Sequence, residues 1–245
     1  MHCSEYDSGV VSQSKVLVVI PARAGSKGIK NKNLISISGV PILAFPINFI
    51  KEESPSCEVV VSTDSNDIAN LAVKLGAGVY RRSDESATDF ALTETILTET
   101  LKWKESQNGF TYDYCIFLTA TSLFRPKGIY QRALNYLESH PSCESYFTAF
   151  PTTKNFWYKN EKNEWNRILP WMATYGSRQT RTPIYREDTG IFSMSRAKLW
   201  RNGKRIGDQV EVEIFDDDFS NIDLHGVKDL ILAEAAIRYN SEIQE

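Results

Sequence analysis

The sequence has few of the residues that build metal clusters, disulfide frameworks or Cys–His nucleophiles. Of its 245 residues only four are cysteine and three are histidine. The cysteines, at positions 3, 57, 115 and 143, form no CxxC pair, and no histidine lies at a useful spacing from them. A disulfide scaffold and a zinc site are therefore not expected. The cytoplasm is the expected compartment.

The sequence also lacks an excess of positive charge and any long apolar run. Lys and Arg number 28 against 31 Asp and Glu, which gives a net charge of −3 and argues against a nucleic-acid partner. No run of 18 apolar residues exists, so no membrane span is predicted. Residues 1–15 are polar and have no signal-peptide core, and we interpret them as a disordered leader or an expression remnant.

What the sequence does have is enough apolar material, 42% of its residues, for one substantial core. We expect one domain over residues 16–245. Short β-branched runs alternate with helical patterns, which predicts a doubly wound, mostly parallel α/β sheet. Strands are expected at 16–20, 58–62, 79–80, 114–118, 145–150 and 190–194, and helices from 41, after a Ser65 cap, and at 89–103, 127–138 and 227–239. Residues 151–184 have weak periodicity and many aromatics, and are expected to leave the sheet as a hairpin arm.

The strongest chemical signal is the segment 21–33, PARAGSKGIKNKN, which follows the first buried strand. Ligands bind at that edge of open α/β sheets. Glycines let backbone N–H groups form an anion nest, and the four cations of the segment can neutralise phosphate charge. Neither GxxxxGK[ST] nor GxGxxG is satisfied. Loop chemistry alone thus favours a phosphate site over a solvated basic turn, although Lys30 by itself is expected to face solvent.

The stretch VIPARAGSKGIKNKNL resembles the opening motif of the acylneuraminate cytidylyltransferase family, enzymes that make CMP-activated nonulosonic acids such as CMP-sialic acid. Weaker matches follow in the same order along the chain, so the resemblance covers residues 16–239. They are Pro41-Ile42-Leu43, Val60-Val61-Ser62-Thr63-Asp64-Ser65, Arg82 with Asp89, Ala120-Thr121-Ser122 with Arg125, Arg178-Gln179, Arg186 and Ile222-Asp223.

The resemblance implies a CTP site in which Arg23 and Lys32 are catalytic and face the triphosphate. A guanidinium can bind two phosphate oxygens at once, whereas lysine supplies a mobile point charge. The implied nucleotide-binding residues are Arg23, Ala24, Gly25, Lys27, Lys32, Asn33, Arg82 and Thr93. Asp64 is ambiguous, because it could cap a helix or be a strand-end carboxylate that needs a hydrogen bond or a cation. Asp89 has the same ambiguity.

The resemblance also implies a magnesium cofactor near Asn221-Ile222-Asp223. The family commonly shows two aspartates there, so Asp223 is the candidate ligand and Asn221 the weaker one. Magnesium takes one or two protein carboxylates plus substrate phosphates, and one aspartate can suffice. The run 216–218, three aspartates, is a rival ligand set, although a solvated turn is favoured for it.

Two departures from the family fall on the presumed acceptor side. Thr119 replaces the glutamine of sialate enzymes, and Asp188-Thr189-Gly190 replaces an asparagine–glycine pair. They argue against assuming N-acetylneuraminate as the acceptor and leave the identity of the sugar acid open. The implied substrate-binding residues are Thr119, Thr121, Ser122, Arg178, Gln179, Arg186 and Asp188.

The resulting hypothesis is a cytidylyltransferase that transfers CMP from CTP to the anomeric hydroxyl of a nonulosonic sugar acid and releases pyrophosphate. The arm 151–184 resembles the family's dimerisation arm, and Phe156, Trp157, Trp165 and Trp171 suit a homodimer interface. These aromatics could instead pack on their own sheet. No general base is identified. The rival hypotheses are a nucleotide-sugar-dependent glycosyltransferase using residues 216–218, and a non-catalytic nucleotide-binding descendant, which Asn221 and Thr119 would favour.

Overall fold

The computed structural model of the chain describes residues 14–25, 28–82, 92–177, 179–217, 219 and 221–243. Among the residues singled out above, Lys27, Asp89, Arg178 and Asp218 lie outside this part of the chain, as does 1–13 of the expected leader. Over the described ranges, no helix combines the length and the apolar character that crossing a bilayer requires.

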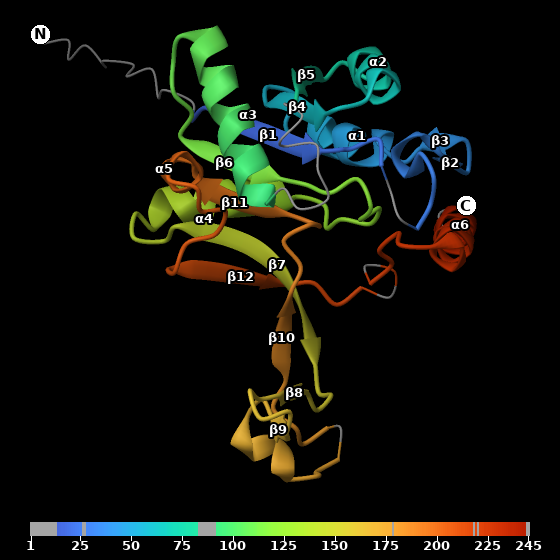
Figure 1. Cartoon of the computed structure of the whole chain (residues 1–245), viewed down its shortest axis with the longest axis vertical. Helices are drawn as coiled ribbons and strands as arrows, with labels where there is room; N and C mark the ends of the chain where they lie inside the picture. Colours follow the sequence, from blue (N-terminus) through green and yellow to red (C-terminus); the bar gives the residue numbers. More distant parts are fainter. Residues whose placement is uncertain are drawn as a thin grey trace, which may run out of the picture.

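The described residues form one sheet of eight strands in the order β10-β7-β11-β6-β1-β4-β5, with β12 paired to β7 (Figure 1). Strands β6, β1, β4 and β5 run parallel, and β11 lies antiparallel between β6 and β7. The prediction of an α/β fold with a mostly parallel sheet is confirmed. The strands are β1 Val16–Pro21, β4 Glu58–Thr63, β5 Gly78–Arg81, β6 Tyr114–Phe117, β7 Ser145–Thr152, β10 Ile184–Glu187, β11 Ser193–Arg196 and β12 Val210–Ile214.

Strand β1 shows why helices cover both faces of this sheet. Val18 and Ile20 belong to one buried cluster, whereas Leu17 and Val19 belong to the other. A strand that is apolar on both sides must be covered on both sides. Helices α1 Ala44–Glu53, α2 Asn66–Lys74, α4 Ile129–Ser139 and α6 Val227–Ile243 contribute to the first cluster, and α3 Thr93–Asn108 and α5 Ala197–Arg201 to the second.

The register of the central strands brings three loops to one edge. Val19 of β1 pairs with Val60 of β4 on one side and with Phe117 of β6 on the other. Because these strands are parallel, the segments that follow them all leave the sheet at its carboxyl edge. Ser65, as predicted, caps the helix that begins there: its Oγ accepts a hydrogen bond from the backbone N of Ile68 at 3.3 Å.

The predicted excursion at 151–184 is an arm that extends from the sheet on the long strands β7 and β10 (Figure 1). Its far end holds the hairpin β8 Trp157–Lys159 and β9 Trp165–Arg167, followed by the 3-10 helix η2 Pro170–Ala173. Met172 is fully buried there, but large aromatics remain exposed, Trp165 at 63%. The other exposed large apolar residues of 156–185 are Phe156, Trp157, Tyr158, Ile168, Trp171, Tyr175 and Tyr185.

Several predicted elements begin or end elsewhere. The strand expected at 190–194 is β11, which starts at Ser193. Gly190 lies instead in a turn, in which Ile191 N donates to Asp188 O at 3.3 Å. The helix expected from Pro41 starts at Ala44, because Pro41 pairs with Ser36 in a small hairpin. Elements absent from the prediction are η1 Lys32–Leu34, β2 Ser36–Ile37, β3 Val40–Pro41, β10, β12, α5 and η2.

Candidate active site

The segment after β1 is held at the carboxyl edge by bonds to the end of β4 and to the residue that follows it. Ala22 N donates to Ser62 O at 2.9 Å, and Ala24 N donates to Asp64 Oδ1 at 2.7 Å. Asp64 is exposed, and it therefore avoids the burial cost considered for a strand-end carboxylate. Ser65 rather than Asp64 caps α2. The Asp64 carboxylate thus orients the backbone of the phosphate-type loop.

Lys32 and Asn33 fold back against this loop through η1. The Asn33 side chain is 8% exposed, and its Nδ2 donates to Arg23 O at 3.0 Å. Lys32 Nζ donates to Leu224 O at 2.6 Å. Burial lowers the pKa of Lys32, Asp223 opposes this effect, and Arg23 adds to it. Lys32 is therefore a partly desolvated cation whose charge would gain most from a nearby anion.

A pocket of about 210 Å³ collects most of these groups. Its lining joins the nucleotide-type loop to the segment that follows β6. The lining residues are Pro21, Arg23, Gly25, Lys32, Asn33, Thr119, Ala120 and Thr121. The structure therefore places the expected triphosphate cations and two of the expected acceptor-side residues around the same space.

Gly28 shows how closely the loop approaches the C-terminal segment. A Cβ at this position would lie 1.9 Å from the backbone oxygen of His225. Any side chain would force the two segments apart, so glycine is required here by packing. Gly28 was part of the predicted loop motif, but its contact with His225, nearly 200 residues further along the chain, could not be predicted from any local pattern.

Arg82 lies beside the same loop, at the end of β5. Its Nη2 donates to Ser62 O at 2.9 Å and its Nε to Ser62 Oγ at 3.1 Å. Burial lowers the pKa of Arg82, Asp64 opposes this effect, and Arg23 adds to it. Arg82 thus contributes positive charge near the loop while it supports β4. Thr93 is the first residue of α3 and is separated by Leu92 from the segment 83–91, which lies outside the described residues.

On the acceptor side, Thr119 is fixed against Gly190. Thr119 Oγ1 donates to Gly190 O at 3.0 Å and lies 3.0 Å from Ser122 Oγ. A Cβ on Gly190 would come within 2.9 Å of the Thr119 side chain. Arg125 supports both segments, since its Nη2 donates to Thr119 O at 2.6 Å and its Nε to Ile191 O at 2.8 Å. The two departures from the family pattern, at 119 and at 188–190, are therefore one connected structure.

Asp223 lies next to these acceptor-side residues through a β-bridge to Ser122. Its Oδ2 is 2.9 Å from His225 Nε2. Its Oδ1 is buried and has no hydrogen-bond partner among the described residues. An unpaired buried carboxylate oxygen is costly, and a bound cation would remove that cost.

Arg186, Asp188 and Asn221 form a second polar cluster beside Asp223. Arg186 Nη2 donates to Asn221 Oδ1 at 3.0 Å and to Asp188 Oδ2 at 3.3 Å. Burial raises the pKa of Asp188, Asp223 raises it further, and Arg186 opposes both. The carboxylates of Asp188 and Asp223 thus lie close together, and Arg186 offsets only part of their negative charge. Within the described ranges, no cluster of three or more His, Cys, Asp or Glu side chains could hold a metal ion, but magnesium needs only one or two carboxylates when phosphates complete its shell.

Some predicted residues do not join this cluster. Gln179 is exposed in the arm and does not line the 210 Å³ pocket. The rival carboxylates are also elsewhere: Asp217 Oδ1 accepts a hydrogen bond from Phe219 N at 2.8 Å, as in a capped turn, and Asp216 lines a cavity with 151–154. The geometry of Asp217 fits the turn that the sequence favoured.

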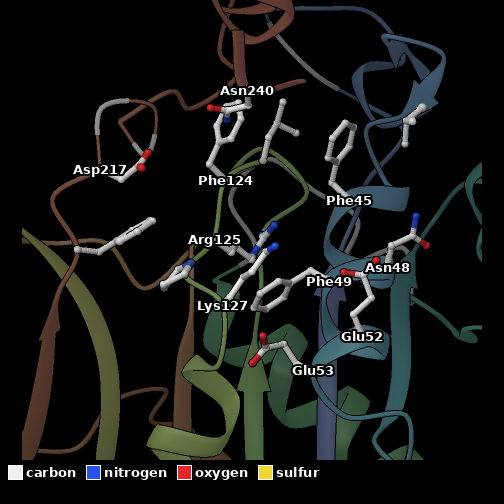
Figure 2. Close-up of a pocket in the computed structure, with 14 residues that line it drawn as sticks. Phe45, Asn48, Phe49, Glu52, Glu53, Phe124, Arg125, Lys127, Asp217 and Asn240 are labelled. Atoms are coloured by element: carbon white, nitrogen blue, oxygen red, sulfur yellow. The ribbon is translucent and has the colours of Figure 1, made fainter. Parts of the chain in front are cut away.

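A larger cavity, of about 790 Å³, lies between α1 and the segments that carry Phe124, Asp217 and Asn240 (Figure 2). It contains none of the residues expected to bind nucleotide or sugar. Arg125 lines it, with its guanidinium carbon 5.6 Å from the Phe49 ring centroid. The Nη1 of Arg125 has no hydrogen-bond partner among the described residues, but it is buried and not offered to the cavity. Size alone therefore does not identify the reaction site.

Sequence reasoning missed the positioning groups of the site more than its charged ones. The backbone oxygens of Leu224 and His225 contact Lys32 and Gly28, and no motif marks them. Arg125 was noted in the resemblance, but its role as a support for 119 and 191 depends on tertiary contacts.

The chain thus combines a mostly parallel α/β sheet with a pocket at the carboxyl edge of its central strands. A family profile described as cytidylyltransferase matches residues 17–221, which is most of the chain. The chain therefore belongs to the cytidylyltransferase family and is an enzyme of that family.

Characterised relatives are similar over most of their length. The chain is 29% identical over 233 residues to the CMP-N,N'-diacetyllegionaminic acid synthase of Legionella pneumophila, which covers 93% of this chain and 98% of the relative. It is 31% identical over 192 residues to a pseudaminic acid cytidylyltransferase of Campylobacter jejuni, which covers 76% of this chain and 80% of the relative.

Solved structures with the same fold are more distant in sequence. A CMP:2-keto-3-deoxy-manno-octonic acid synthetase complexed with CTP superposes with a TM-score of 0.65 at 14% identity, covering 93% of this chain and all of that one. A 4-diphosphocytidyl-2C-methyl-D-erythritol synthase from Anaerococcus prevotii gives a TM-score of 0.61 at 14% identity, with 92% and 99% coverage. At this level of identity these structures establish the fold alone.

Proposed function

We propose that the protein transfers CMP from CTP to the anomeric hydroxyl of a nonulosonic sugar acid and releases pyrophosphate. The observation that carries the proposal is the shared pocket, in which Arg23 and Lys32 face the same space as Thr119 and Thr121. The reaction needs a triphosphate and a sugar acid side by side, and this pocket joins a cationic wall to a hydroxyl-rich one. Relatives named for legionaminic and pseudaminic acids support the class of acceptor.

In the proposed reaction, the 2-hydroxyl of the sugar acid attacks the α-phosphorus of CTP. A bond forms between that oxygen and phosphorus, the α–β phosphoanhydride bond breaks, and the hydroxyl proton is lost. Phosphoryl and nucleotidyl transfers of this kind are accelerated mainly by positioning and by charge stabilisation. Arg23 and Lys32 supply the charge, and the backbone of Gly25 supplies an amide donor. Ala24 N already donates to Asp64 Oδ1, so Ala24 contributes by holding the loop in place.

The remaining nucleotide contacts are proposed from their place at the same edge. Asn33 holds the Arg23 carbonyl and so fixes the loop that carries the arginine. Arg82 adds charge beside Asp64, and Thr93 opens the helix that starts at this edge. Lys27 remains a proposed phosphate contact by its place in the motif, outside the described residues.

The residues present fit a magnesium ion held mainly by Asp223. Its Oδ1 is buried without a hydrogen-bond partner among the described residues, as a ligand oxygen kept for a cation would be. Asn221 can add a carbonyl oxygen, which has two lone pairs and already accepts from Arg186. When bound, magnesium would offset the oxygen charge that shields the α-phosphorus.

The acceptor would be held by hydroxyl and charged groups on the other wall. Thr119, Thr121 and Ser122 supply hydroxyls, and Asp188 supplies a carboxylate for the sugar's polar substituents. Arg186 is the proposed partner of the sugar-acid carboxylate, with Arg178 and Gln179 proposed from the motif alone. A carboxylate and a guanidinium pair well because two parallel N–H···O bonds can form.

We also propose that the arm pairs two copies of the chain into a homodimer. Its tip exposes aromatic side chains of the kind enriched at interfaces, among them Trp165 and Tyr175. Sedimentation velocity on the wild type and on Trp165→Glu tests this. A dimer that the substitution converts to monomer supports the proposal, and a wild-type monomer overturns it.

A pyrophosphate-release assay with CTP and a panel of nonulosonic acids tests the proposed function. The expected result is release that requires both CTP and a sugar acid of this class. Hydrolysis or transfer from a nucleoside diphosphate sugar without pyrophosphate would identify a glycosyltransferase instead. Binding of CTP without turnover of any sugar acid would identify a non-catalytic descendant.

A further inference from the structure

Arg205 lies in the segment between α5 and β12, and its side chain contacts the acceptor side of the site at Thr189. Its Nη1 donates to Thr189 Oγ1 at 2.5 Å. Thr189 is 6% exposed and stands between Asp188 and Gly190, the short loop that departs from the family pattern. Within the described chain, this is the contact that anchors the side chain of Thr189.

The same guanidinium lies between two acidic groups from different elements. Its Nε is 3.5 Å from Glu94 Oε1 at the start of α3, and its Nη2 is 3.8 Å from Glu187 Oε1 at the end of β10. Its central carbon lies 5.0 Å from the ring centroid of Phe117, the last residue of β6. One side chain therefore touches three of the segments that meet at the carboxyl edge.

Arginine suits this position because its planar fork offers five donors in fixed directions. The backbone beneath it is also fixed: Arg205 O accepts from Ser195 Oγ at 2.8 Å and from Trp200 Nε1 at 3.2 Å. The side chain is 22% exposed. A partly buried, anchored guanidinium can hold a loop in one position far better than a mobile surface cation can.

We propose that Arg205 is a positioning residue for the sugar-acid acceptor, and this inference rests on the proposed function. The path is short: Arg205 fixes Thr189, and the next residue, Gly190, accepts hydrogen bonds from Thr119 N and Oγ1. Asp188 lies on the other side of Thr189. Loss of Arg205 frees both acceptor-side groups at once, whereas Lys32 and Asn33 on the nucleotide wall keep their own contacts.

Arg201, the last residue of α5, provides a matched control, because it also pairs with a glutamate of α3. Its Nη2 lies 2.5 Å from Glu105 Oε1 of α3 and 2.7 Å from Tyr112 O. Like Arg205, it joins the α5 region to α3 through an Arg–Glu pair. Tyr112 lies just before β6, so this pair is at the opposite, amino edge of the sheet. Removal of Arg201 therefore reports the stability cost of such a pair without touching the site.

The experiment is steady-state kinetics of Arg205→Met, Thr189→Val, the double variant and Arg201→Met, with each substrate varied in turn. We expect Arg205→Met and Thr189→Val each to raise the KM for the sugar acid about tenfold, the scale of one lost hydrogen bond to a charged group. The KM for CTP should stay within about twofold, which is about 0.4 kcal/mol. The double variant should be no worse than either single variant, because the two residues share one interaction.

Two further variants separate positioning from fold. Thr189→Ser keeps the hydroxyl and should behave like the wild type, and Arg201→Met should lower Tm while leaving both KM values unchanged. The inference is overturned if Arg205→Met leaves the sugar-acid KM unchanged, or if it raises the KM for both substrates equally.

Failure of the proposed function would be visible separately, as a wild type that transfers CMP to no sugar acid. Hydrogen exchange then decides the inference without turnover. Arg205→Met, but not Arg201→Met, should speed exchange of the amides of 188–191, and equal protection in both variants would overturn it.

Discussion

Ser122 and Asp223 pair through an isolated antiparallel bridge, which joins the segment after β6 to the segment before α6. Leu224 extends the contact, since its N donates to Thr121 O at 3.3 Å and its O accepts from Lys32 Nζ at 2.6 Å. The bridge thus sets the candidate magnesium ligand between the threonine and serine hydroxyls of 119–122 and Lys32, which is proposed to face the phosphates.

Lys32→Ala should cost about 2–4 kcal/mol of transition-state stabilisation, as the loss of other charge-stabilising donors does. The partly buried ammonium would face the phosphates, and alanine removes it. The measurement is kcat/KM for pyrophosphate release. Lys30→Ala is the matched control, because Lys30 is exposed in the same loop and should retain activity. Near-normal turnover in Lys32→Ala would remove this loop from the mechanism.

CTP should raise Tm more than ATP, GTP or UTP at equal concentration. A ligand that binds only the native state stabilises it according to its own affinity. The cytosine preference follows from family membership rather than from a contact seen in the pocket. Differential scanning fluorimetry checks it, with magnesium present throughout. Equal shifts for all four nucleotides would contradict a cytidylyl specificity and leave phosphate binding intact.

Asp223→Asn should nearly abolish turnover at any magnesium concentration, because the substitution neutralises the main proposed ligand. Asp217→Asn is the control: its carboxylate accepts from Phe219 N in a turn, and activity should survive. Magnesium titrations of both variants provide the measurement. A wild-type response from Asp223→Asn, with loss of activity in Asp217→Asn, would move the metal site to the run 216–218.

Asp188→Asn should be more stable than the wild type at neutral pH in a chelator. Burial raises the pKa of Asp188 above its usual value, so at a pH between the unfolded-state and folded-state pKa values the folded state holds a proton that the unfolded state has lost. Wild-type stability therefore falls as pH rises from about 3.9 through the raised folded-state pKa, and asparagine removes that loss. Urea unfolding across this pH range measures it. A constant difference between the two proteins would show that ionisation of Asp188 does not cause the effect.

The same substitution should weaken the sugar acid's binding, because Asp188 is a proposed acceptor contact. If Asp188→Asn were both more stable and more active than the wild type, Asp188 would not be an acceptor contact. A gain in stability at the expense of activity is the usual outcome where a site holds groups in unfavourable surroundings.

The sequence predicted the central elements well because their signals are local. Val16 to Ile20 is apolar on both faces, and Ser65 precedes an amphipathic stripe, so β1 and the cap of α2 could be read without tertiary information. The prediction missed strand β12, although its alternating pattern is typical of a strand: Val210, Val212 and Ile214 alternate with Glu211 and Glu213. In contrast, α5 spans only Ala197–Arg201, too short for any helical period to emerge.

The candidate site was predictable as a set of residue types, but its internal bonding was not. The cations and glycines of the loop 21–33 indicated a phosphate site, and the family resemblance indicated Asp223 as a magnesium ligand. Nothing local could pair Lys32 with the Leu224 carbonyl or Arg205 with Thr189, because these contacts depend on how distant segments pack. Asp64 illustrates the limit. Of its two predicted roles, the helix cap is wrong and the hydrogen-bonded strand-end carboxylate is correct, but its donor, the amide of Ala24, could not be identified from the sequence.

The tight approach of Gly28 to His225 has a consequence for the order in which the enzyme becomes competent on the ribosome. The loop that contains Gly28 is synthesised nearly 200 residues before the segment that braces it. Synthesis proceeds at about 5–20 residues per second, so the loop emerges many seconds before residues 223–225. A nascent chain can therefore build its central strands early, but the pocket at their carboxyl edge is braced only after residues 223–225 have been synthesised.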